Sequence, residues 1–186
     1  MENKHLIWTE ESVRPVFKAK VFTIRENLCR SPTGKTGVYT TLDASDWAVV
    51  IPVLKTGGGD KFVMVRQWRH GSRELSLEFP GGVFEAGEHP EEAAAREMEE
   101  ETAYAPGKVT RLATMSPNPA IMGNRVHFFL AEELRYMGEQ RLDEDEYVDV
   151  ELLPVGEVIR NMGQPPYVHA LMASALMFYL RKGQGG

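Results

Sequence analysis

The chain has 186 residues, of which 42% are hydrophobic and 26% are charged, and its formal net charge at pH 7 is −6. This length and composition fit one well-buried domain with a small appendage and argue against wholesale disorder. The acidic balance argues against a nucleic-acid-binding groove, because such a groove gathers Lys and Arg.

The first segment, MENKHLIWTEESVRP, carries acidic residues where a signal peptide needs an apolar run. No apolar run anywhere approaches the ~20 residues that cross a bilayer. Cys29 is the only cysteine, so no internal disulfide forms, which fits a reducing compartment. We therefore expect a cytoplasmic protein that binds neither membrane nor nucleic acid.

Residues 1–45 are predicted to form an N-terminal β-hairpin arm. Residues 16–27 (VFKAKVFTIREN) alternate apolar and polar side chains, which predicts a strand. Residues 38–43 (VYTTLD) are rich in β-branched and aromatic side chains, and the intervening SPTGKTG turn allows the two segments to pair. A second domain is predicted over residues 46–186.

Two strands are expected at the start of that domain. Residues 47–54 (WAVVIPVL) form a nearly continuous apolar run, which is typical of a strand buried on both faces. The glycine-rich turn KTGGGD separates it from the next predicted strand, KFVMVRQW at 61–68. The run LSLEFP then leads into Gly81 and Gly82, where the alternation stops.

From Pro90 the pattern changes to that of a helix, because proline suits the first helical position and acidic residues follow in the first turn. This helix should end before Pro106–Gly107. Further strands are expected at 108–115, 125–134 and 147–153, and further helices at 155–162 and 167–182. Strands on both sides of one central helix favour an α+β fold with a mixed sheet packed between helices.

Three glutamates of the central helix share one of its faces. Glu97, Glu100 and Glu101 are spaced i, i+3 and i+4, so their like charges repel by about 0.2–0.5 kcal/mol for each pair. Three converging carboxylates form a site for a hard divalent cation such as Mg²⁺ or Mn²⁺, and the cation would offset the repulsion. The alternative is a solvated acidic face, which is the commoner meaning of a glutamate-rich helix.

The wider spacing around these glutamates is regular. Five residues separate Gly82 from Glu88, seven more lead to Arg96–Glu97, and then follow Met98, Glu100–Glu101, Ala103 and Tyr104. This resembles the signature of the Nudix hydrolases, and every fixed position matches except the last, where Ala103 replaces a glycine. Glycine would end the helix in the left-handed conformation, so alanine there is either strained or lets the helix run toward Pro106.

The resemblance implies an α/β/α sandwich and the hydrolysis of a nucleoside diphosphate linked to another moiety. It implies that Glu97, Glu100 and Glu101 hold one or more Mg²⁺ ions, with Mn²⁺ as the alternative, and that the Gly81 carbonyl completes the ligand set. The metals would neutralise the diphosphate and activate a water molecule.

The same resemblance implies roles for the other fixed residues of the motif. Arg96 is expected to orient the catalytic glutamates and not to bind substrate. Glu88 is expected to be structural or an outer metal ligand. Gly82 is expected to let the backbone turn tightly beside the site.

The segment VRQWRHGSRELSLEFPGG resembles the corresponding part of ADP-ribose pyrophosphatases and related sugar-nucleotide pyrophosphatases. Pro119 follows the motif by fifteen residues, as in that subfamily, although Ser116–Pro117–Asn118–Pro119 stands where the subfamily usually has a Ser-Pro-Gly turn. The resemblance implies cleavage of ADP-ribose to AMP and ribose 5-phosphate. GDP-mannose, another nucleotide sugar or a dinucleotide is the alternative substrate.

Substrate contacts are expected from Arg66 and Arg69, because guanidinium binds phosphate through two aligned donors. On an alternating strand only some of Arg66, Trp68 and Arg69 face the site, and each arginine is otherwise a surface residue. By the same resemblance Glu78 lines the pocket, and the alternative is that it pairs with a neighbouring basic residue. The acidic run RLDEDEYVDVELLP matches a mobile loop that carries a catalytic glutamate in the subfamily. By position, Glu146 is the first choice for the general base and Glu144 the second. If the run is only a solvated loop, a glutamate of the motif takes the proton.

ADP-ribose pyrophosphatases of this kind are typically dimers whose N-terminal strands cross to the partner, so the resemblance implies a homodimer that exchanges the arm. A non-catalytic nucleotide-sugar sensor on the same fold is the alternative, and the presence of all three helix carboxylates argues against it. An acidic structural domain without a nucleotide ligand would require the whole spacing to be coincidence.

Overall fold

The computed structural model describes residues 3–183, which divide into two compact units. Unit 1 contains the chain up to Ser45 together with Ser116–Arg125, and unit 2 contains Asp46–Met115 together with the chain from Val126 onward. The predicted arm therefore belongs to unit 1, which also takes in a later loop. Within residues 3–183, none of the helices has the length and apolar character needed to cross a membrane.

Unit 1 is a three-stranded antiparallel sheet and not the hairpin expected from the sequence. After a short 3-10 helix, η1 (Lys4–Leu6), the strands are β1 (Thr9–Lys18), β2 (Phe22–Arg30) and β3 (Thr36–Ala44), in the order β1-β2-β3. The single strand predicted over 16–27 is wrong, because the chain reverses where Ala19 N–H donates to Phe22 C=O at 2.9 Å. The turn is formed by Lys20 and Val21, and neither belongs to the residue types Gly, Pro, Asn and Asp that usually indicate a turn. The predicted pairing across SPTGKTG is present between β2 and β3.

The later loop of unit 1, residues 116–125, lies beside β3. Leu42 N–H donates to Ile121 C=O at 2.7 Å, and Gly123 N–H donates to Leu42 C=O at 3.2 Å. The loop and the three strands together line a small cavity of about 240 Å³.

Unit 2 contains one six-stranded mixed sheet. Its strands and first helix are β4 (Trp47–Leu54), β5 (Lys61–Arg69), β6 (Glu74–Glu78), α1 (Pro90–Thr102), β7 (Tyr104–Ala105), β8 (Lys108–Met115), β9 (Val126–Glu132), β10 (Arg135–Tyr136) and β11 (Val148–Pro154), followed by α2 (Val155–Asn161) and α3 (Ala170–Gly183). The order is β11-β5-β4-β9-β8 with β6 on β5, and β7 pairs with β10. Only the β4–β9 pairing is parallel among these described strands, so the sheet is mixed, as predicted.

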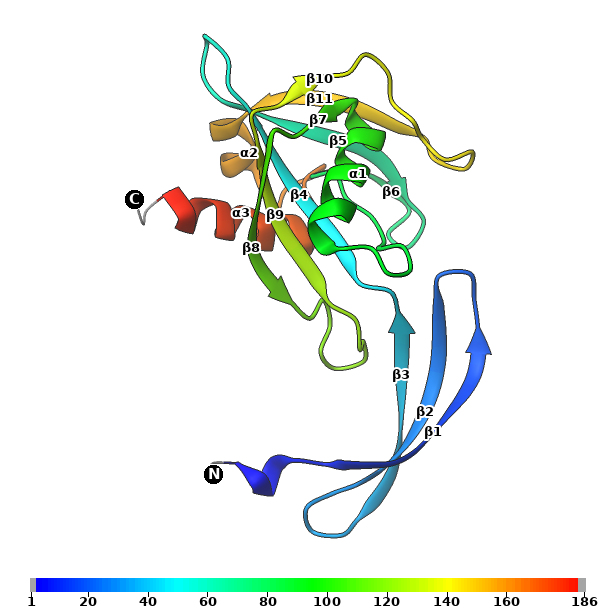
Figure 1. The fold of residues 1–186 in the computed structure, drawn as a ribbon. Helices are drawn as coiled ribbons and strands as arrows, with labels where there is room; N and C mark the ends of the chain where they lie inside the picture. The colour runs from blue at the N-terminus through cyan, green and yellow to red at the C-terminus, as the bar shows by residue number, and fades with distance from the viewer. Residues whose placement is uncertain (1–2, 184–186) are drawn as a thin grey trace. The chain divides into compact units, whose positions relative to one another are not determined.

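Helices cover both faces of this sheet (Figure 1). Alternate residues of β4 divide between two cores: Val49 and Ile51 pack toward α2 and α3, whereas Ala48 and Val50 pack toward α1. The apolar run of β4 therefore reflects burial on both faces. The predicted α+β fold with an α/β/α sandwich is confirmed.

β4 and β5 pair over only two positions and then diverge, which leaves room for residues 80–84 beside β4. Ala48 N–H donates to Gly82 C=O and Val50 N–H donates to Pro80 C=O, both at 2.9 Å. A Cβ atom at Gly81 would lie 2.1 Å from the Ala48 carbonyl oxygen. Only glycine permits this close approach, which brings the Gly81–Gly82 pair against α1.

α1 ends at Thr102, and Ala103 adopts the left-handed conformation with φ 59° and ψ 21°. The helix therefore ends in a strained left-handed alanine and does not run on toward Pro106. Ala103 N–H donates to Glu99 C=O at 2.9 Å, and Ala103 C=O accepts Met137 N–H at 2.8 Å. The helix end is therefore held by hydrogen bonds without the usual glycine.

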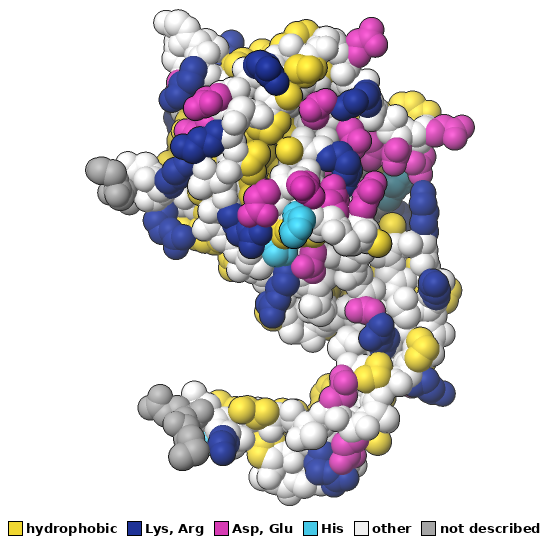
Figure 2. Space-filling model, in the orientation of Figure 1, with side chains coloured by type: hydrophobic (Ala, Val, Ile, Leu, Met, Phe, Trp, Pro, Cys, Tyr) yellow, Lys and Arg dark blue, Asp and Glu magenta, His cyan; other side chains and the backbone are white. Residues whose placement is uncertain are grey.

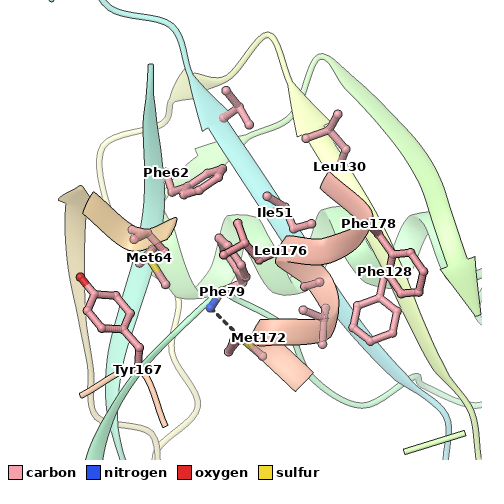
Figure 3. Packing of buried hydrophobic residues seen from close by; sticks show 14 of the residues in the cluster. Ile51, Phe62, Met64, Phe79, Phe128, Leu130, Tyr167, Met172, Leu176 and Phe178 are labelled. Atoms are coloured by element: carbon pink, nitrogen blue, oxygen red, sulfur yellow. Dashed lines mark hydrogen bonds between the residues drawn. The ribbon is translucent and has the colours of Figure 1, made fainter. Parts of the chain in front are cut away.

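α3 supports the segment that leads into the glycine pair. Phe79 N–H donates to Met172 Sδ at 3.0 Å inside the core shared by Phe62 and Leu176 (Figure 3). Phe79 and Met172 are both 2% exposed, so this sulfur replaces a backbone or water acceptor for a buried donor.

Met172→Leu is expected to lower the free energy of unfolding by about 1–3 kcal/mol, because it leaves the Phe79 N–H without an acceptor at nearly constant apolar volume. Urea unfolding measures the change. Met177→Leu is the matched control, since Met177 lies on the exposed side of α3 and should change stability by less than about 0.5 kcal/mol. Equal stabilities of the two variants would show that the sulfur contact is dispensable.

Candidate active site

The three helix carboxylates lie at different depths on one face of α1. Glu101 is only 4% exposed, and its Oε2 accepts Gly81 N–H at 2.9 Å. Glu97 lies against Gly82, where a Cβ atom would be 2.3 Å from Glu97 Oε2. The Glu100 side chain is nearer to solvent. The glycine pair therefore fits around the carboxylates. Figure 2 shows Asp and Glu side chains, with Lys and Arg among them, on the part of unit 2 where α1 lies.

Arg96 joins the carboxylates to the loop before the helix. Its Nε and Nη2 donate to the two carboxylate oxygens of Glu88 at 2.8 and 3.0 Å. Its Nη1 donates to Glu97 Oε1 at 2.9 Å and to Glu100 Oε2 at 3.0 Å. The Arg96 hydrogen bonds hold the pKa of Glu88 below its usual value. These contacts are the ones expected of an orienting Arg96, and they hold in place Glu88, which is predicted to be structural or an outer metal ligand.

Arg96→Lys is expected to weaken divalent-cation binding by about 10–100-fold, because lysine keeps the charge but cannot bridge Glu88, Glu97 and Glu100 together. Titration calorimetry with Mn²⁺ measures the affinity. Arg111→Lys is the control, since Arg111 pairs with Glu91 at the start of the helix. Unchanged Mn²⁺ affinity in Arg96→Lys would remove the orienting role.

The buried carboxylates are unfavourable as anions. Burial, with further contributions from the charges of Glu97 and Glu146, raises the pKa of Glu101 to about 8, although the Gly81 N–H and Arg69 oppose the shift. Burial also raises the pKa of Glu97, which Arg96 partly opposes. A divalent cation would offset both effects, since it favours the charged carboxylates.

The residues present fit such a cation in chemistry, because carboxylate oxygens are the ligands that Mg²⁺ and Mn²⁺ prefer. Within residues 3–183, no three His, Cys, Asp or Glu side chains already stand in a metal-binding arrangement. Arg96 Nη1 donates hydrogen bonds to both Glu97 and Glu100, and Gly81 N–H donates one to Glu101. These hydrogen bonds engage Glu97 Oε1, Glu100 Oε2 and Glu101 Oε2.

Arg69 and Glu78 form a bidentate ion pair beside the carboxylates. Arg69 Nε and Nη2 donate to Glu78 Oε1 and Oε2 at 2.8 and 2.6 Å. Burial opposes ionisation of Glu78, but the Arg69 hydrogen bonds and charge hold its pKa below the usual value. Glu78 is 1% exposed while the Arg69 side chain is 41% exposed, so Arg69 alone presents donors to a ligand. The charge of Arg69 also acts on Glu101.

Arg66 lies elsewhere. Alternation along β5 places it on the face of Phe62 and Met64, which pack toward α2 and α3. Its Nε donates to Glu151 Oε1 at 2.5 Å, and the pair lines a cavity of about 330 Å³ with Glu157. Arg66 is therefore not brought to the carboxylates of α1.

The acidic loop, residues 142–147, carries the two predicted base candidates, Glu144 and Glu146, and both are exposed. Glu146 N–H donates to Asp143 C=O at 3.0 Å, and Glu146 Oε2 accepts Asp143 N–H at 3.3 Å, which forms a local turn. The Glu146 charge contributes to the raised pKa of both Glu97 and Glu101. Glu146 is therefore within electrostatic reach of the site.

Two further groups near the site gave no sequence signal. His169, immediately before α3, is close enough for its charge to affect Glu78, and burial lowers its pKa. Gln140 and Arg141 donate hydrogen bonds to the last turn of α1. None of the three belongs to a recognisable spacing, because their positions depend on contacts between distant segments.

Comparison with known proteins agrees with this geometry. The family model of the NUDIX domain matches residues 45–173. The ADP-ribose pyrophosphatase of Bacillus subtilis (strain 168) is 32% identical over 164 residues, which cover 88% of this chain and 87% of that protein. The methanol dehydrogenase activator of Bacillus methanolicus is 29% identical over 146 residues, covering 78% and 77% of the two chains.

A solved structure described as the crystal structure of ADP compounds hydrolase has the same fold, with a TM-score of 0.85, 24% sequence identity, and coverage of 98% of this chain and 99% of that chain. The family match spans most of the chain and includes the carboxylate helix, the glycine pair and the acidic loop. The predicted resemblance is thus confirmed: the chain belongs to the Nudix family and is a Nudix hydrolase, of a family that generally needs a divalent metal.

Proposed function

We propose that the protein hydrolyses the pyrophosphate bond of ADP-ribose, producing AMP and ribose 5-phosphate. The reaction class is that of its family. The choice of ADP-ribose is supported by the name of the Bacillus subtilis relative and by the VRQWRHGSRELSLEFPGG segment. The observation that carries the proposal is the buried carboxylate face of α1, where Glu101 and Glu97 lie against Gly81 and Gly82.

We propose Mg²⁺ as the cation, with Mn²⁺ as the alternative. Glu97, Glu100 and Glu101 would hold it, and the Gly81 carbonyl is the further candidate ligand. When bound, a divalent cation neutralises pyrophosphate charge and lowers the pKa of a water molecule. Arg96 keeps Glu97 and Glu100 oriented through the hydrogen bonds described above.

Substrate binding is proposed for Arg69, whose guanidinium is half exposed and is held in place by Glu78. It would bind a phosphate oxygen with the donors that Glu78 leaves free. Glu78 then acts through Arg69 and not by touching the substrate. Proton transfer from the attacking water is proposed for Glu146, with Glu144 as the second candidate.

The test is the release of AMP or GMP, in the presence of Mg²⁺, from ADP-ribose, ADP-glucose, GDP-mannose, NADH, a diadenosine polyphosphate and modified nucleoside triphosphates. Metal-dependent AMP release should be strongest from ADP-ribose and be lost in Glu100→Gln. Glu92→Gln is the matched control, because Glu92 is exposed in the first turn of the same helix.

The panel also separates the alternatives. Stronger cleavage of GDP-mannose or a dinucleotide would keep the chemistry and change the substrate. No cleavage of any compound, with tight ADP-ribose binding, would favour the nucleotide-sugar sensor and contradict the proposed hydrolysis.

We propose in addition that the protein is a homodimer formed through unit 1. Support comes from large apolar side chains exposed on its strands and leading segment, including Leu6, Ile7, Phe17 and Val38. Monomeric proteins seldom expose so many apolar groups on one small sheet. Light scattering coupled to size exclusion should give twice the chain mass, and a strict monomer would remove this proposal.

A further inference from the structure

The Gln140 side chain ties together three parts of unit 2. Its Nε2 donates to Glu101 C=O at 2.5 Å, in the last turn of α1, and to Val148 C=O at 3.2 Å, at the start of β11. Both hydrogens of this amide are thus used on backbone carbonyls. Because residues 141–147 lie between Gln140 and Val148, one side chain closes the base of the acidic loop.

Arg141 adds two contacts from the same side of the loop. Its N–H donates to Glu100 C=O at 2.9 Å, and its guanidinium pairs with the Glu99 carboxylate at 2.5 Å. The carbonyl groups of the last helical turn have no partner within the helix. Here the residues before the acidic loop supply partners to Glu100 and Glu101, which are themselves proposed metal ligands.

Capping of a helix end explains why these carbonyls need partners, but it does not require that the partners come from this loop. The tie to Val148 goes further, since it fixes the far end of the loop to the same helical turn. Glu146, between the two ties, influences the pKa of Glu97 and Glu101. Hydrogen bonds of Gln140 and Arg141 therefore connect the ends of the loop to the carboxylate helix.

We propose that Gln140 and Arg141, here called the loop tether, are positioning residues that hold the two ends of the acidic loop at the last turn of the carboxylate helix and so keep its glutamates within reach of the site. This inference rests on the proposed function, because it assigns the tether a role in proton transfer by Glu146 or Glu144. A loop displaced by about 1 Å can lose a catalytic contact at a cost of about 10²-fold in rate.

The surroundings of Gln140 permit a clean variant. Gln140 lines an open cleft of about 720 Å³ together with Leu142, Val150, Leu152 and Tyr104. Leucine at position 140 would pack against these apolar walls while removing both amide hydrogens. Gln140→Leu therefore tests the hydrogen bonds with little loss of packing, and Gln140→Glu tests them at nearly constant shape.

The experiment is a double-mutant cycle with ADP-ribose as substrate. In the otherwise unchanged enzyme, Gln140→Leu should lower kcat by about 10–100-fold and change KM by less than about threefold. In the background of Glu144→Gln with Glu146→Gln, where the loop carries neither candidate base, the same substitution should change the residual kcat by less than about twofold. A purely structural role would instead give the same loss in both backgrounds.

Hydrogen exchange at the Arg141 amide is the second readout, measured by NMR on the metal-free chain. Gln140→Leu should speed this exchange at least about tenfold while the amides in the middle of α1 keep their protection. The tether is overturned by an unchanged kcat in Gln140→Leu, by equal losses in the two backgrounds, or by unchanged exchange. The proposed function fails separately, if the unsubstituted enzyme cleaves no compound of the panel.

Discussion

Glu97→Gln is expected to lower kcat/KM for ADP-ribose by about 10³-fold. The substitution keeps the side-chain length and an oxygen that accepts the Arg96 Nη1 hydrogen bond, but it removes the negative charge. A metal ligand contributes several kcal/mol of charge stabilisation, and about 4 kcal/mol corresponds to a factor of about 10³ in rate. Initial rates over a range of Mg²⁺ and ADP-ribose concentrations measure the loss.

The metal dependence of the loss identifies its cause. If Glu97 is a ligand, the Mg²⁺ concentration for half-maximal rate should rise together with the fall in kcat. Glu92→Gln, an equal change of charge at an exposed position of the same helix, should leave both values near those of the unsubstituted enzyme. A loss of less than about tenfold in Glu97→Gln would contradict its place among the metal ligands.

The carboxylate helix can be predicted from the sequence because the signals for it lie within a few residues of one another. Glu97, Glu100 and Glu101 are neighbours on a helix of regular period, and Pro90 marks where that helix begins. The mixed sheet was predictable for the same reason, since runs such as 47–54 show burial directly in their composition. The helix end was predictable only as two alternatives, because propensity alone does not say whether Ala103 accepts strain.

Contacts between distant segments explain what the sequence did not show. The turn at Lys20–Val21 has no turn-forming residue, so the alternation of side chains continues through it and predicts one strand. Arg66 and Arg69 lie three positions apart on β5, so alternation places them on opposite faces of the sheet. Which face holds the carboxylates, and that Arg69 meets Glu78 while Arg66 meets Glu151, depends on how β5 pairs with β6 and β11. Gln140 gains its role from carbonyls on two other elements.

The metal-free protein is expected to lose stability as pH rises from about 5 to about 8. Burial places the pKa of Glu101 at about 8 in the folded protein, above its ordinary value of 4.5. Between those values the folded state keeps a proton that the unfolded state has released, so increasing pH favours unfolding. Each unit of difference in pKa is worth about 1.4 kcal/mol, so the effect should amount to several kcal/mol.

Other shifted carboxyl groups do not cancel this slope, although His169, whose pKa burial lowers, contributes in the opposite direction in the part of the window near its ordinary value of 6.5. The raised pKa of Glu97 acts in the same direction. The lowered pKa values of Glu78 and Glu88 give stability that is present above their unfolded pKa and is lost only as pH falls through their folded values, which is below this window. Urea unfolding in a chelator, at several pH values across the window, measures the slope.

Two comparisons decide whether Glu101 causes the slope. Glu101→Gln should flatten much of it, because the amide is neutral at every pH and its oxygen can still accept the Gly81 N–H. Saturating Mg²⁺ should stabilise the unsubstituted protein far more near pH 8 than near pH 5, since the cation needs the ionised carboxylates and offsets their desolvation. An equal gain at both pH values would mean that the cation does not bind at the buried carboxylate. Cation binding would then not offset the repulsion between the glutamates of α1, and the burial of Glu101 would have to be explained without a metal ion.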